Sequence, residues 1–287
     1  MSQNPLVSIV LPTHNGSRYL DQAVQSCLDQ TCTNWELVIV DDASTDNTPV
    51  RIAQYLAEDD RIRSLRHETN RKLPRALNTG FSLAKGTYFT WTSDDNCYRP
   101  NAIAEMVAFL ESHPEIDVVY TDYSNIDQTG RVLRQVTIWD QDVLLRGNAI
   151  GPCFLYRRKV HEAIGGFAED LFLAEDYNFW LKASVLFRLQ PLHKDLYLYR
   201  LHSDSLTAKE KERIQLATER ALASNLPHMS WAGTAARAQA YLHLAQQALE
   251  RHARLVALGY LLHALPHSPS LVFSTTLRYL ARWDLPK

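Results

Sequence analysis

The chain has 287 residues, 46% of them hydrophobic, and a formal net charge of −2 with histidine neutral. Such a chain can bury a sizeable core as one large domain, or as one domain with a small appendage. The near-neutral charge gives no general electrostatic reason to expect nucleic acid as a partner.

The cysteines and the N-terminus indicate where the protein works. Four cysteines are scattered without a C-x-x-C pair, so they predict neither a disulfide framework nor a zinc site. A reduced compartment fits this pattern. The first five residues have no basic-then-apolar signal pattern, and no apolar run is long enough to cross a bilayer. We expect a cytoplasmic protein, either free or held peripherally at the inner face of the membrane.

The first part of the chain alternates between strand and helix patterns. Leu6–Leu11 is a short apolar run typical of a buried parallel strand. Helical spacing follows over Tyr19–Gln30, and a second strand is predicted over Glu36–Val40. A second amphipathic helix runs over Thr48–Leu56, and Arg63–Arg66 is a short third strand.

The same alternation continues beyond residue 70. Arg75–Ala84 has a helical pattern, and Thr87–Thr92 is a predicted strand. Pro100 is predicted to begin another helix, and Asp117–Tyr120 is a further strand. This βαβαβ order predicts an α/β fold, with a mainly parallel sheet covered by helices on both faces.

The composition changes after about Thr207. Alanine, leucine, glutamine, glutamate and arginine dominate through Tyr260, and a last helix is predicted over about 270–282. We therefore divide the chain into a domain of residues 1–207 and a C-terminal helical region of residues 208–287. Apolar residues of the last helix are expected to meet a membrane surface or a second subunit; they include Leu277, Leu280 and Trp283.

Polar side chains follow three of the predicted strands. The first strand ends at Pro12–Gly16, the second at Asp41–Asp42, and a later one at Asp94–Asp95. In an open parallel sheet, ligands bind beyond the carboxyl ends of the strands. Acids and amides are thus expected to gather along one edge of the sheet, where a ligand would bind.

Each acidic position has two interpretations. Asp42 can accept hydrogen bonds from a base imide or a ribose, or it can belong to a helix cap, a role that Ser44 and Asp46 fit better. Asp94–Asp95 can hold Mg²⁺ or Mn²⁺ against a diphosphate, or form a polar loop before the next helix.

Two positions further along the chain carry similar alternatives. Asp176, in the pair Glu175–Asp176, can deprotonate an acceptor hydroxyl, or it can be a helix N-terminal acid favoured by the dipole. His202 can contact a metal or a diphosphate, or be structural. The acceptor side is predicted to be lined by Trp139, Gly151–Cys153 and Trp180.

Four groups of motifs, in this order and spacing, resemble glycosyltransferase family 2, the large GT-A family with a Rossmann-like sheet. The resemblance covers residues 5–207. The motifs are Val7–Asn15 with Tyr19-Leu20 and Ser26–Thr31; Trp35–Thr48; Asn78–Gly80 and Ala84–Tyr88 leading to Asp94-Asp95; and Gly165–Phe167 with Glu175-Asp176 and Trp180.

The resemblance implies a role for individual positions. Around the donor nucleotide it implies Pro12, Thr13, Asn15, Asp42, Asn70, Arg71 and Asp94. It implies a metal, Mn²⁺ or Mg²⁺, held by Asp95 with Asp94 and His202, and it makes Asp176 the catalytic base. The family commonly has Asp-x-Asp-Asp at the metal site, whereas this chain has Thr92 at the first position. That departure leaves open which acid binds the metal directly.

The resulting expectation is an inverting glycosyltransferase. It would move a sugar from a nucleoside-diphosphate sugar, most simply a UDP-sugar, to a hydroxyl of a carbohydrate or lipid-linked acceptor in bacterial polysaccharide or glycoconjugate synthesis. A nucleotidyltransferase is one alternative, but its glycine-rich basic loop after the first strand does not match Pro12–Gly16. A non-catalytic nucleotide-sugar-binding protein on the same fold is the other. The expected partners include no nucleic acid.

Overall fold

The apolar runs near the N-terminus form neighbouring parallel strands in the computed structural model, which describes residues 6–275. Strand β1 (Val7–Thr13) pairs with β2 (Trp35–Asp41) and with β4 (Tyr88–Trp91), and β2 pairs with β3 (Ile62–Arg66). All of these pairs are parallel. Every residue of β1 and β2 is buried, as expected for central strands covered on both faces.

The second half of the sheet is mixed. The strand order is β3-β2-β1-β4-β8-β6-β9-β5, and β7 also pairs with β6. The β6–β9 pair is parallel, whereas β4–β8, β6–β8, β6–β7 and β5–β9 are antiparallel. The bounds are β5 (Cys97–Tyr98), β6 (Val118–Ile126), β7 (Val132–Val136), β8 (Phe154–Arg157) and β9 (Leu189–Arg200). The predicted α/β fold is confirmed, and the antiparallel pairs extend it beyond the expected strands.

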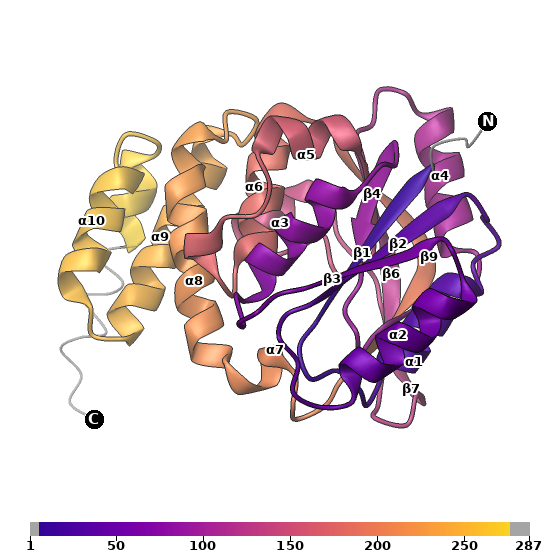
Figure 1. The fold of residues 1–287 in the computed structure, drawn as a ribbon. Helices are drawn as coiled ribbons and strands as arrows, with labels where there is room; N and C mark the ends of the chain where they lie inside the picture. The colour runs from indigo at the N-terminus through magenta and orange to yellow at the C-terminus, as the bar shows by residue number, and fades with distance from the viewer. Residues whose placement is uncertain (1–5, 276–287) are drawn as a thin grey trace.

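Helices cover both faces of the sheet (Figure 1). Along β1 the side chains alternate: Val7, Ile9 and Leu11 pack in one core layer, and Val10 in the other. The first layer holds α1 (Leu20–Leu28), α2 (Thr48–Glu58) and α4 (Ala102–Ser112). The second holds α3 (Leu73–Leu83), α5 (Arg158–Ile164) and α6 (Glu175–Leu186).

The predicted helices and strands of the first half lie within a few residues of the observed ones. Two starts differ by two residues: α3 begins at Leu73 instead of Arg75, and α4 begins at Ala102, after Pro100. The chain makes a turn at Pro100, whose carbonyl accepts a hydrogen bond from the backbone N–H of Thr31.

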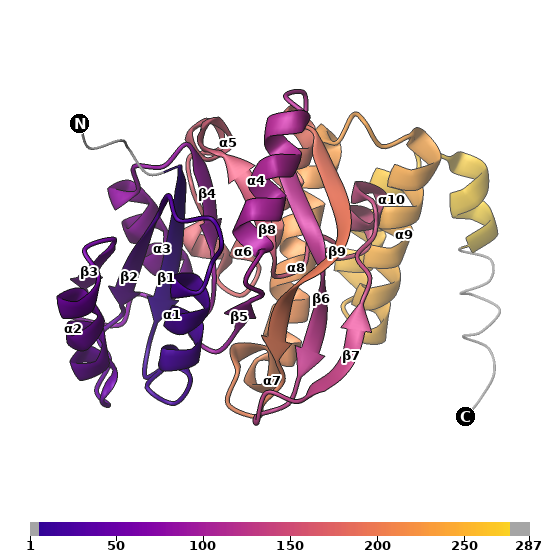
Figure 2. The ribbon, with the colours of Figure 1, turned by 90° about the vertical axis from the view of Figure 1, so that its right-hand side faces the viewer.

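The C-terminal region is helical, as predicted. It contains α7 (Leu206–Lys209), α8 (Lys211–Asn225), α9 (Thr234–Glu250) and α10 (Arg254–Ala264). Figure 2 shows α9 and α10 at one end of the molecule, whereas α7 lies below the strands. Helix α8 packs on α6, and Asn225 Nδ2 donates to Asn178 Oδ1 over 2.9 Å. The division at residue 207 stays a prediction, because buried residues of α8 and α9 share a core layer with α6.

The last predicted helix is only partly described. Residues 269–275 are helical, and Leu277, Leu280 and Trp283 lie outside the described residues. Among the helices of residues 6–275, none is long and apolar enough to cross a membrane.

Candidate active site at the carboxyl ends of the strands

The register of the sheet places the first polar residues side by side. Thr13 pairs with Asp41 across β1 and β2, and β4 leaves the sheet alongside β1. Thr13 Oγ1 therefore donates to Asp94 Oδ2 over 2.5 Å. Gly16 closes the loop, and a Cβ there would overlap the Asp94 carboxylate and the Thr13 hydroxyl. Burial, together with the charge of Asp95, raises the pKa of Asp94 to about 7.

Asp95 meets His202, although 107 residues separate them. Strand β5 pairs antiparallel with β9, and Cys97 lies opposite Leu198. The residues just before β5 therefore lie near the residues just after β9. Asp95 Oδ2 and His202 Nε2 lie 2.9 Å apart. The other atoms of the two groups, Asp95 Oδ1 and His202 Nδ1, are buried and have no partner among the described residues.

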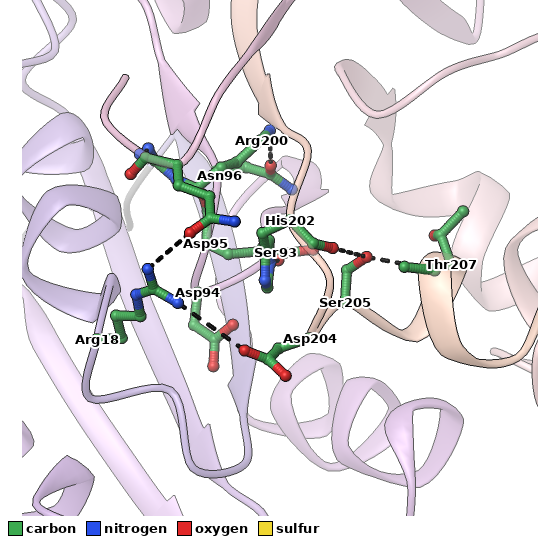
Figure 3. Close-up of polar contacts among 12 residues, drawn as sticks. Arg18, Ser93, Asp94, Asp95, Asn96, Arg200, His202, Asp204, Ser205 and Thr207 are labelled. Carbon is green, nitrogen blue, oxygen red and sulfur yellow. Dashed lines mark hydrogen bonds and ion pairs between the residues drawn. The ribbon is translucent and has the colours of Figure 1, made fainter. Parts of the chain in front are cut away.

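Arg200 supports this pair and was not anticipated from the sequence. Its side chain is buried, its Nε donates to the Asp95 carbonyl over 2.8 Å, and one Nη donates to Gln22 over 2.6 Å. Its guanidinium also lies over the ring of Tyr19, whose edge contacts His202. Figure 3 shows Asp94, Asp95, Arg200 and His202, together with the ion pair between Arg18 and Asp204. The signal for Arg200 in the sequence was only its place two residues before His202.

The donor atoms of Asp95 and His202 fit a divalent cation. Mg²⁺ in particular is usually bound through one or two carboxylates, with substrate phosphates and water as the other ligands. Across residues 6–275, no three His, Cys, Asp or Glu side chains are grouped to enclose a metal. Two protein groups with buried, unpaired polar atoms suit an ion that takes its remaining ligands from a diphosphate.

Asp42 organises the loop that follows β3. Its carboxylate accepts hydrogen bonds from the backbone N–H groups of Arg71 and Lys72, each over 2.8 Å. His67 Nδ1 lies 2.7 Å from Asp42 Oδ1, and its Nε2 lies 3.0 Å from Thr79 Oγ1. These contacts use three of the roughly four lone-pair sites of the carboxylate. Sequence reasoning did not identify His67.

The neighbouring loops are tied to each other. Asn15 has a left-handed backbone, with φ 57°, and its Oδ1 accepts from the backbone N–H of Thr45 over 2.8 Å. Its own N–H donates to Ser44 Oγ over 2.9 Å, so Ser44 holds Asn15 and does not cap a helix. Asp46 lies one residue before Asn47, the N-cap of α2, and its Oδ1 accepts from the N–H of Thr48, the first residue of that helix. Pro12 lies within β1, before these loops.

Asn70 and Arg71 share the loop held by Asp42. Asn70 Oδ1 accepts from the N–H of Lys72 over 3.0 Å, and Lys72 has a φ of 72°. Asn70 and Arg71 are exposed. The loop therefore has a fixed backbone and presents two side chains to solvent.

Asp176 lies in the first turn of α6, where the helix dipole favours an acid. Its Oδ2 accepts from Asn148 Nδ2 over 2.8 Å. Burial raises the pKa of Asp176, and burial with the charge of Asp176 raises that of Glu175 to about 8. Glu175 is turned inward and accepts from the N–H of Leu173, so Asp176 is the more accessible acid of the pair. Asn148 is a further residue that sequence reasoning missed.

The prediction for the acceptor side is partly wrong. Trp180 and Cys153 are fully buried, and Trp180 packs against Phe154 and Phe179 in the core, so neither can line a ligand site. Trp180 falls on the inner side of α6, where apolar burial stabilises the helix against the sheet. Trp139 is 67% exposed.

The sheet order and the helices on both faces of the sheet define an α/β protein of GT-A type. Comparison with known protein families identifies the family: the one described as "Glycosyl transferase family 2" matches this chain over residues 8–165. The chain belongs to this family.

Among curated relatives, an uncharacterized glycosyltransferase of Rickettsia felis is 36% identical over 219 residues, which are 71% of this chain and 36% of that protein. Chondroitin synthase of Escherichia coli is 28% identical over 209 residues, which are 72% of this chain and 30% of that protein. The chain thus spans about a third of the length of the curated relatives it matches first.

Solved structures share the fold. TarS of S. aureus (residues 1–349, in complex with UDP-GlcNAc) superposes with a TM-score of 0.71 at 19% identity, covering 94% of this chain and 83% of that one. The mannosyltransferase PcManGT of Pyrobaculum calidifontis, in complex with GDP-Man and Mn²⁺, gives a TM-score of 0.63 at 19% identity, covering 100% and 82%.

Proposed function

We propose that the protein is an inverting glycosyltransferase that uses a nucleoside-diphosphate sugar, most simply a UDP-sugar. The observation that carries this proposal is the meeting of Asp95 and His202, with one buried, unpaired polar atom on each. The structural neighbours support the donor class, since TarS was solved with UDP-GlcNAc and PcManGT with GDP-Man and Mn²⁺.

Asp95 and His202 would hold Mn²⁺ or Mg²⁺ beside the donor diphosphate, with Asp94 next to them. Asp95 and His202 would thereby place a positive charge where the leaving diphosphate develops negative charge. Thr13 and Gly16 keep Asp94 in place, and Arg200 fixes the Asp95 backbone. The remaining lone-pair site of the Asp42 carboxylate would accept a hydrogen bond from the base or the ribose. Asn15, Asn70 and Arg71 would surround the nucleotide, and Pro12 would lie beneath it.

Asp176 would act as the catalytic base. The acceptor oxygen attacks the anomeric carbon, the bond from that carbon to the diphosphate breaks, and the hydroxyl proton moves to the Asp176 carboxylate. One such displacement inverts the anomeric configuration. Burial raises the pKa of Asp176, which increases its affinity for the proton, and Asn148 orients its carboxylate.

The acceptor is proposed to be a carbohydrate or a lipid-linked saccharide in bacterial polysaccharide or glycoconjugate synthesis. The relative named chondroitin synthase supports a polysaccharide product.

The first test is a thermal-shift panel of nucleoside-diphosphate sugars with and without Mn²⁺, because a ligand of the native state raises the melting temperature. We expect stabilisation by one donor class, strengthened by Mn²⁺. Asp95→Ala should remove the strengthening, and Asp204→Ala, at an exposed acid of the same region, should keep it. Equal Mn²⁺ dependence of UDP binding in Asp95→Ala, measured by calorimetry, would contradict the metal assignment.

The second test is the anomeric configuration of the product by NMR. Inversion is expected for a single displacement. Retention would exclude Asp176 as a simple base, and stabilisation by nucleoside triphosphates alone would favour a nucleotidyltransferase.

A further inference from the structure

A cavity of about 540 Å³ lies where the 3-10 turn η1 (Gln141–Leu145) faces the start of α9, away from the donor groups described above. Protein sites that bury small ligands have volumes of about 300–1,000 Å³. None of the residues assigned above to the donor, the metal or the base lines the cavity.

The wall of the cavity combines an aromatic ring with small apolar residues. Trp231 is half-buried, and its indole N–H donates to Ser184 Oγ over 3.2 Å, which holds the ring. The apolar wall is completed by Leu145, Ala232, Ala236 and Ala240.

Four polar side chains complete the lining: Asp142, Arg146, Gln239 and His243. Asp142, Arg146 and Gln239 are exposed, and within the described part of the chain none of the three makes an ion pair or a side-chain hydrogen bond. An acid, a guanidinium and an amide are therefore available together beside an apolar wall.

This combination suits a neutral, hydroxylated ligand. Asp142 disfavours a phosphate or other anion, and a fatty chain would remove polar groups from water without replacing their hydrogen bonds. A saccharide presents C–H groups to the face of an aromatic ring and hydroxyls to carboxylate, amide and guanidinium groups.

One segment of the chain, residues 144–148, both lines the cavity and contacts the residues around the candidate base. The Leu144 carbonyl accepts a hydrogen bond from the hydroxyl of Tyr177, which is next to Asp176. Arg146 is two residues before Asn148, so their Cα atoms are at most about 7 Å apart, and Asn148 donates to Asp176. A ligand in the cavity and the base are thus connected through residues 144–148.

We propose that this cavity binds a saccharide unit of an extended carbohydrate acceptor, distant from the reacting hydroxyl. The inference rests on the proposed function, and it adds that the acceptor is a glycan chain longer than one sugar.

The test is binding of saccharides in the absence of donor. The probes are an array of uncharged bacterial polysaccharide fragments of increasing length, followed by calorimetry on the fragment that binds best. The test variant is the double substitution Arg146→Ala, Gln239→Ala. The matched control is Arg220→Ala, an exposed arginine on α8 outside the cavity.

We expect the wild type and Arg220→Ala to bind a fragment equally and the double variant to bind it about tenfold more weakly or worse. Binding of UDP with Mn²⁺ should stay the same in all three proteins. Unchanged fragment affinity in the double variant, or no binding by any fragment, would overturn the inference. If UDP and UDP-sugars fail to bind while a fragment does, the proposed function fails and the cavity assignment stands alone.

Discussion

The two sides of the candidate site are built in different ways. On the donor side each acid is held by a group from another strand end: Asp94 by Thr13, Asp95 by His202, and Asp42 by backbone N–H groups of the loop after β3. On the acceptor side Asp176 is held by Asn148, which lies in an irregular segment between β7 and β8. Sheet register thus fixes the proposed donor groups, whereas one side-chain contact from a loop orients the proposed base.

The largest expected effect is on the acceptor side. Asp176→Asn keeps the shape of the side chain and removes the proton acceptor, so turnover should fall by about 10²–10⁴-fold. Donor binding should persist, because Asp176 does not contact the donor groups. Steady-state kinetics with calorimetry of UDP checks both expectations.

Glu175→Gln is the matched control and should reduce turnover less, because Glu175 points inward to the N–H of Leu173. Near wild-type transfer by Asp176→Asn would place the base elsewhere. Loss of folding in that variant would favour the helix-dipole role.

The next effect concerns the donor side. Asp42→Ala removes two charge-assisted hydrogen bonds to the backbone of Arg71 and Lys72 and leaves His67 without its carboxylate. We expect the free energy of unfolding to fall by about 2–3 kcal/mol and UDP affinity to fall with it. Urea denaturation and calorimetry measure the two changes.

Asp204→Ala is the control for Asp42→Ala, because Asp204 is exposed and forms ion pairs with the exposed side chains of Arg18 and Lys209, so its loss should change stability little. If the stability of Asp42→Ala equals that of the control, the loop is not held by this carboxylate.

The last expected effect is gradual: stability depends on pH through a histidine in the core. His161 packs among aromatic rings that include Phe81 and Phe179, and burial lowers its pKa to about 4. Between pH 6.5 and 4 the unfolded chain binds more protons at this residue than the native state does. Its contribution to stability is therefore present above about pH 6.5 and is lost as the pH falls toward 4, by at most about 1.4 kcal/mol per pH unit.

His161→Phe should flatten this slope, and thermal unfolding at pH 4.5–7.5 compares the two proteins. Glu175 acts in the opposite direction, because its raised pKa keeps a proton in the native state, so the difference between the proteins is the quantity to measure. If the plots of stability against pH are parallel for the two proteins, His161 binds protons equally in the native and unfolded states, and the prediction is wrong.

The sequence by itself determined the first half of the fold. Short apolar runs at 6–11 and 36–40 predict buried parallel strands, and the observed β1 and β2 contain them. The same reasoning placed Thr13, Asp42 and Asp94 at one edge, because strand ends in a parallel sheet point the same way. Local periodicity and the polarity of parallel strands are enough for that conclusion.

Only the tertiary structure decided the pairings that depend on distant segments. His202 reaches Asp95 through the antiparallel β5–β9 pair, and Asn148 reaches Asp176 from an irregular segment. Trp180 was expected near the acceptor but faces the core, because the sequence does not show which side of α6 packs on the sheet. Periodicity describes one element at a time, whereas these contacts depend on strand order and on the packing of elements that lie far apart in the chain.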